Sequence, residues 1–161
     1  MKSQKHSSTN VLPEPLEFYL DETNDCPHLA QALIDAGQIV HRRKEHFKEG
    51  TDDIDWIPVV AENRWIIITR DTAQRKIESE LRALIVSKAR SFCIPNNAPR
   101  AKMAELVLKA LPEISKLVAR HEGPLIASIH ENTKGGVNIA VYYPTKQARN
   151  KYAQFSKADK E

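Results

Sequence analysis

Two short apolar runs of this sequence, LEFYL and WIIIT, each lead into an acidic side chain, Asp21 after the first run and Asp71 after the second. A polar turn between the runs supplies Asp53 just ahead of an apolar helical pattern. If the two runs are neighbouring parallel strands, their carboxylates emerge at one edge of the sheet, where open α/β sheets place their ligand sites. Carboxylates crowded together repel each other and need a cation, for which oxygen-preferring Mg²⁺ or Mn²⁺ is the best match.

Each of these acidic positions also has an ordinary structural interpretation. An aspartate directly after a strand, such as Asp21, is often a turn or cap residue. Asp53 is placed to cap a helix N-terminus, a task for which Asp52 competes. The recurrence of an acidic residue after both apolar runs favours metal binding for Asp21 and Asp71. Further local candidates for metal ligands are Glu22 and Asp55.

Basic side chains lie near the acidic positions in the sequence. Arg70 and Arg75 flank Asp71. Arg42 and Arg43 belong to the basic stretch HRRKEHFK. Contact with a phosphate backbone is one interpretation, and solvated surface charge is the alternative. The formal net charge of +3 is too small to argue for nucleic acid by itself.

The apolar patterns predict strands that alternate with helices. Strands are expected at 16–20, 38–42, 65–69 and 91–94, followed by a hairpin with strands at 125–132 and 137–143. Helices are expected at 27–37, 53–63, 77–88 and 100–121, the last with a kink or a break into two helices at Pro112. Strands alternating with helices form βαβ units. The predicted fold class is therefore α/β, a three-layer α/β/α sandwich with a mainly parallel sheet and a C-terminal β-hairpin.

Length and composition indicate one domain in a reducing compartment. A chain of 161 residues can bury a substantial core. No apolar run approaches the roughly 20 residues of a membrane span, and the N-terminus lacks the apolar segment of a signal peptide. The two cysteines form no CxxC pair. We expect a cytoplasmic protein with no membrane association, built from a flexible arm at 1–14, a domain at 15–143 and a basic tail at 144–161.

The C-terminal segment mixes basic and aromatic residues. From Lys134 to the end there are six basic side chains and two acidic ones, spaced among three tyrosines and Phe155. Such a mixture can follow a phosphate backbone and stack on bases, whereas a solvated and partly disordered tail is the alternative. We expect the part after about Pro144 to be dispensable for folding and to support binding of RNA or a protein partner.

The order of the acidic motifs resembles a known family. LDE, then GTDDIDWIP, then WIIITRD resembles the small PIN-like toxins of bacterial toxin–antitoxin systems, from about Phe18 to Ile129. The resemblance implies a parallel α/β/α sandwich whose strand-end carboxylates hold Mg²⁺ or Mn²⁺ and cleave phosphodiester bonds in RNA. It places the catalytic, metal-binding aspartates at Asp21, Asp53 and Asp71.

The resemblance also implies a fourth acidic residue and a set of partners. Glu22 and Asp55 are the local candidates for the fourth acidic position. The implied partners are an RNA substrate and an antitoxin protein, and a homodimer remains open. In this interpretation the RNA backbone is positioned by Arg42, Arg43, Arg70 and Arg75.

Two rival functions stay open from the sequence. One is a PIN-like fold without catalysis that binds RNA or a protein partner, distinguished by whether the acidic pocket is complete and takes up Mn²⁺. The other is a phosphatase-like α/β enzyme, which is disfavoured because the DxDx(T/V) nucleophile motif is absent.

Overall fold

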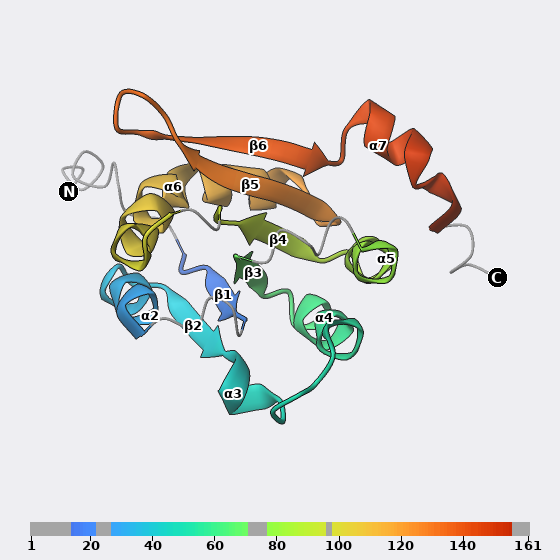
Figure 1. Cartoon of the computed structure of the whole chain (residues 1–161), viewed down its shortest axis with the longest axis horizontal. Coiled ribbons are helices and arrows are strands. Elements are labelled where there is room, and N and C mark those ends of the chain that lie inside the picture. Colours follow the sequence, from blue (N-terminus) through green and yellow to red (C-terminus); the bar gives the residue numbers. More distant parts are fainter. Residues whose placement is uncertain (1–13, 22–26, 71–76, 96–97, 156–161) are drawn as a thin grey trace, which may run out of the picture.

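The computed structural model describes residues 14–21, 27–70, 77–95 and 98–155 (Figure 1). Along the chain its elements are β1 (Glu17–Leu20), α2 (Pro27–Asp35), β2 (Ile39–Arg42), α3 (Arg43–His46), α4 (Asp53–Glu62), β3 (Ile66–Thr69), α5 (Glu78–Val86), β4 (Arg90–Cys93), α6 (Arg100–Arg120), β5 (Leu125–Glu131), β6 (Val137–Tyr143) and α7 (Lys146–Lys151). None of the described helices is long and apolar enough to span a membrane.

Six strands form one sheet in the order β2-β1-β3-β4-β5-β6. The first five strands of that order pair in parallel, and β6 pairs with β5 in the antiparallel sense as the second strand of the expected hairpin. The predicted fold class, a mainly parallel α/β sandwich with a C-terminal hairpin, is confirmed. Because β1 and β3 are parallel neighbours, both end at the same edge of the sheet.

Two apolar cores lie on opposite faces of the sheet. Side chains alternate between the faces of a strand, so Phe18 and Leu20 enter the core formed with α2 and α6. Tyr19, between them, enters the core formed with α4, α5 and α7. β3 is buried along its whole length, which explains why its sequence is apolar without alternation.

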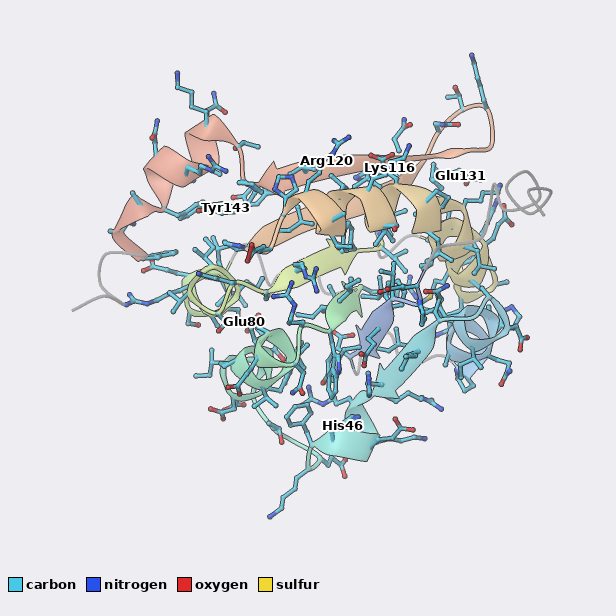
Figure 2. The ribbon with its side chains drawn as sticks, turned by 180° about the vertical axis from the view of Figure 1, so that it is seen from behind. His46, Glu80, Lys116, Arg120, Glu131 and Tyr143 are labelled. Carbon is cyan, nitrogen blue, oxygen red and sulfur yellow. The ribbon has the colours of Figure 1, made fainter. Side chains whose placement is uncertain are left out.

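Two elements differ from the sequence-based expectation. The charged stretch after β2, expected as a loop, folds into the short helix α3, whose first turn is closed by the Glu45 carboxylate accepting from the Arg42 N–H at 3.0 Å. α6 remains one helix across Pro112, so the alternative of two consecutive helices is wrong. Its ribbon changes direction along its length instead, as the expected kink requires (Figure 2).

The start of the basic tail packs on the domain. Thr145 caps α7, accepting from the Ala148 N–H at 3.0 Å. Ala148 and Phe155 are buried in the same core as Tyr19, and the Phe155 ring stacks on Tyr152 at 5.4 Å. The packing contradicts our expectation that everything after Pro144 is dispensable for folding. The sequence did not reveal it because two aromatic residues in a charged segment are too few to show a periodicity.

Phe155→Ala should lower the free energy of unfolding by about 3 kcal/mol, because it leaves a cavity where a ring is 97% removed from solvent. Urea denaturation measures this loss. Gln154→Ala, at an exposed neighbour, serves as the matched control and should change stability by less than about 0.5 kcal/mol. Equal stability of the two variants would show that the segment does not pack as described.

Candidate active site

Asp21 is a buried carboxylate held at the end of β1. Leu20 pairs with Ile68, so Asp21 and Thr69 are neighbours across the two parallel strands. The Thr69 hydroxyl donates to Asp21 Oδ2 at 2.6 Å, and the exposed fractions of Asp21 and Thr69 are only 3% and 1%. A carboxylate removed from water needs such partners. The interaction fixes one oxygen of Asp21 at the carboxyl edge of the sheet.

Asp53 is the first residue of α4, and the preceding Asp52 is the N-cap. Asp52 makes no side-chain capping bond, and the Asp53 carboxylate instead accepts from the Trp56 indole N–H at 2.8 Å. Trp56 is fully buried, with its ring 4.8 Å from that of Tyr19. The apolar core therefore fixes Asp53 through Trp56, one turn further along the helix.

Asp21 and Asp53 both lie within electrostatic range of the buried Tyr19 hydroxyl. Burial raises the pKa of Tyr19 well above its ordinary value, the nearby Arg43 guanidinium lowers it, and the charges of Asp21 and Asp53 both raise it further. The two carboxylates thus act on one buried atom. The Arg43 side chain lies close enough to interact with this hydroxyl and lowers its pKa, although the two groups do not meet the strict geometry of a hydrogen bond.

The three described arginines among the predicted RNA contacts differ in burial. Arg43 is buried, donates to the Thr51 carbonyl and lies 5.8 Å over the Trp56 ring, so it supports the segment leading into α4. Arg70 is half-buried and donates to the Ala98 carbonyl at 2.7 Å. Arg42 is partly exposed in the last position of β2.

Three of the predicted site residues lie outside the described residues: Asp71, Glu22 and Arg75. Asp55 is described, and it is exposed in the first turn of α4. Within the described part of the chain, no three acidic, histidine or cysteine side chains are grouped as a metal site. The structure therefore places Asp21 and Asp53 within electrostatic range of the same buried hydroxyl, and the roles of all the candidates stay predictions.

The basic stretch that begins in β2 and continues through α3 contains a histidine pair that the sequence did not reveal. His41 Nδ1 lies 3.2 Å from His46 Nε2, and the other His41 nitrogen lies 2.9 Å from the Glu17 carboxylate. The His41 ring also stacks on Trp65 at 3.7 Å. His46 lies on α3 beyond the edge strand (Figure 2). Only the pairing of β2 with β1 brings Glu17 to His41, so spacing in the sequence gave no signal.

Comparison with known proteins decides the family. The sequence model described as "PIN like domain" matches residues 16–96, half of the chain. The chain belongs to the PIN-like domain family. The matched segment contains Asp21, Asp53 and Asp71, and it confirms the resemblance drawn from the acidic motifs.

This PIN-like chain is also similar to a curated bacterial protein. It is 29% identical over 126 residues to "Putative ribonuclease VapC45" of Mycobacterium tuberculosis (strain ATCC 25618 / H37Rv), an alignment covering 75% of this chain and 91% of the relative. No solved structure matches the chain significantly. An alignment that covers 75% of the chain is longer than residues 1–96, so the similarity extends past the PIN-like segment into α6.

Thr69→Val should destabilise the protein by about 1–3 kcal/mol, because it removes the hydroxyl donor and leaves a buried carboxylate oxygen without that partner. Thr69→Ser keeps the donor and should cost less than half as much. Chemical denaturation of the three proteins at pH 7 measures the difference. If the valine variant is no less stable than the serine variant, the hydrogen bond to Asp21 does not provide the stability assigned to it.

Proposed function

We propose that this protein is a Mg²⁺- or Mn²⁺-dependent endoribonuclease and the toxin of a bacterial toxin–antitoxin pair, active in the cytoplasm. Three observations support the proposal: membership of the PIN-like family, similarity to a protein named as a ribonuclease, and the geometry of the strand-end carboxylates. The main structural support is the buried Asp21 carboxylate, which accepts a hydrogen bond from Thr69. Asp21 and Asp53 both lie within electrostatic range of the Tyr19 hydroxyl.

The residues present fit a divalent cation. The donors are carboxylate oxygens, the ligands that Mg²⁺ and Mn²⁺ prefer. Asp21 and Asp53 lie within electrostatic range of the same buried hydroxyl, and like charges near one another favour a bound cation. Asp21, Asp53 and Asp71 would hold the ion, with Glu22 or Asp55 as the fourth acidic residue. When bound, such an ion lowers the pKa of a coordinated water and offsets the charge that builds on the phosphate.

The chain's own residues orient this site. Thr69 fixes the orientation of the Asp21 carboxylate by donating to its Oδ2. Trp56 does the same for Asp53. Arg42, Arg70 and Arg75 are the remaining candidates to bind the phosphates of the RNA. An antitoxin protein would act as the inhibitory partner, and a homodimer remains open.

The decisive variant is Asp21→Asn, which keeps the shape of the side chain and removes one ligand charge. Wild-type protein should cleave RNA, and Mn²⁺ should raise its melting temperature because the ion binds only the folded state. Asp21→Asn and Asp71→Asn should lose both properties. In EDTA each variant should be as stable as the wild type or more so, because the repulsion between carboxylates is relieved.

Asp35→Asn is the matched control for this experiment, since Asp35 is an exposed aspartate at the end of α2. It should keep both RNA cleavage and the Mn²⁺-dependent shift in melting temperature. If Mn²⁺ shifts no melting curve and the wild type leaves RNA intact, the protein is a non-catalytic PIN-like module that binds RNA or a protein partner.

A further inference from the structure

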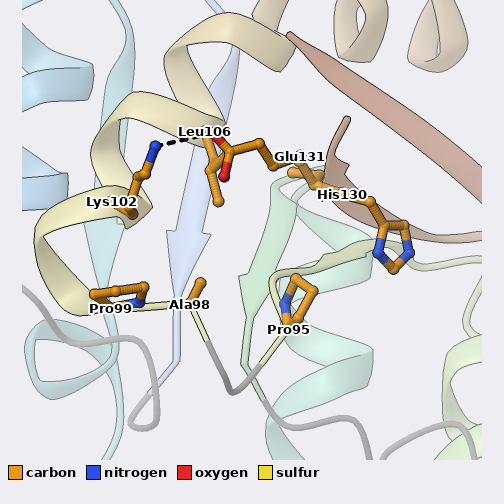
Figure 3. A pocket seen from close by; sticks show the side chains of 8 residues that line it. Pro95, Ala98, Pro99, Lys102, Leu106, His130 and Glu131 are labelled. Atoms are coloured by element: carbon orange, nitrogen blue, oxygen red, sulfur yellow. Dashed lines mark hydrogen bonds and ion pairs between the residues drawn. The ribbon is translucent and has the colours of Figure 1, made fainter. Parts of the chain in front are cut away.

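A cavity of about 470 Å³ opens at the carboxyl ends of β4 and β5, where they meet the first turn of α6 (Figure 3). Its floor is apolar and includes the rings of Pro95 and Pro99. Leu106 and Ile129 complete that apolar surface. The shape and the lining are those of a site for a flat, mainly apolar group with polar edges.

An ion pair provides the polar edge of the cavity. Lys102 Nζ lies 2.8 Å from Glu131 Oε2, and the two side chains come from α6 and β5 respectively. Figure 3 shows Lys102 and Glu131 meeting across the cavity, with His130 on its other side. The hydrogen bond to Glu131 raises the pKa of Lys102, so the amine is fully charged at neutral pH.

The ion pair presents its polar atoms in a defined order. The two Glu131 oxygens are acceptors, and the Lys102 ammonium beside Oε2 is a donor. A guanine base carries the complementary order on its Watson–Crick edge: the 2-amino group and N1–H are donors, and the adjacent O6 is an acceptor. Adenine, by contrast, presents an acceptor at N1 to the carboxylate. Single-stranded RNA is recognised through such edges of splayed-out bases.

The cavity lies at the same carboxyl edge of the sheet as the candidate active site. Arg70 follows β3 directly after Thr69 and donates to the carbonyl of Ala98, a residue that lines the cavity. Three strand spacings, about 15 Å, separate β1 from β5, the strand that carries Glu131. The cavity opens on the side of the sheet that α6 covers, at a distance that a bound RNA strand of a few nucleotides can span.

We propose that this cavity binds a guanine base of the RNA substrate, a few nucleotides along the strand from the phosphodiester bond that is cleaved. Glu131 accepts hydrogen bonds from N1–H and the 2-amino group, Lys102 donates to O6, and the proline-lined floor packs against the face of the base. Glu131 and Lys102 are specificity-determining residues in this account. The inference rests on the proposed ribonuclease function for its biological meaning, but the binding site itself is independent of catalysis.

Nucleotide binding in EDTA tests the cavity without cleavage. Isothermal titration calorimetry should show that guanosine 5′-monophosphate binds wild-type protein at least about tenfold more tightly than adenosine 5′-monophosphate, the usual discrimination of a bidentate contact. Glu131→Gln, which replaces one acceptor with a donor, should abolish this preference. Lys102→Met should weaken guanosine monophosphate binding as well.

Glu105→Gln is the matched control. Glu105 lies on the same helix, 3.5 Å from Lys102, but it does not line the cavity. This variant should keep the preference for guanosine monophosphate. Equal binding of the two nucleotides to the wild type, binding of neither, or a preference that survives Glu131→Gln would each overturn the proposal.

Cleavage assays with Mn²⁺ separate this proposal from the ribonuclease function. Two short RNAs should be compared that differ at one position. One RNA carries guanosine there, and the other carries inosine, which lacks the 2-amino group. Faster cleavage of the guanosine RNA, lost in Glu131→Gln, supports the guanine site. Equal cleavage of both RNAs overturns the guanine site and leaves the ribonuclease proposal standing. If neither RNA is cleaved, the ribonuclease proposal fails, and the calorimetry in EDTA still decides whether the cavity binds guanine.

Discussion

A hydrogen bond of 2.6 Å from Thr69 to Asp21 joins the ends of two neighbouring parallel strands. The bond exists because β1 and β3 run in the same direction and in a register that sets Leu20 beside Ile68. A shift of one residue would turn Asp21 to the opposite face of the sheet, into the core that contains Leu20. A buried carboxylate tolerates no such change, so the register of these strands and the chemistry of the sheet edge depend on each other.

The aromatic core beneath the edge connects the two described carboxylates. Tyr19 contacts Trp56, which donates to Asp53, and the Arg43 guanidinium lies over the Trp56 ring while it donates to the Thr51 carbonyl. The packing of Tyr19 against Trp56 therefore positions the Asp53 carboxylate at the start of α4. The position of the carboxylate therefore depends on packed side chains of the core, which have fixed conformations, rather than on the surrounding loops.

The sequence predicted the parts of this structure that depend on local patterns. Continuous apolar runs marked β1 and β3, the Gly135-Gly136 turn marked the hairpin, and the acidic residue after β1 marked the edge where Asp21 lies. The parts that were missed depend on tertiary contacts. Arg43 resembled a solvated charge but is buried against Thr51 and Trp56, and Phe155 resembled part of a loose tail but fills a core position. The cavity at Lys102 and Glu131 was equally invisible, because those residues are 29 positions apart in the sequence.

Anomalous diffraction from crystals grown with MnCl₂ tests the central claim most directly, that the carboxyl edge of β1 and β3 is a divalent-metal site. The account predicts a manganese peak roughly 2.1 Å from the Asp21 oxygen that does not bond to Thr69, with Asp53 contacting the ion directly or through a water. The peak should be absent from crystals of Asp21→Asn. A peak found only at another position, such as the His41–His46 pair, or no peak at all, would contradict the account.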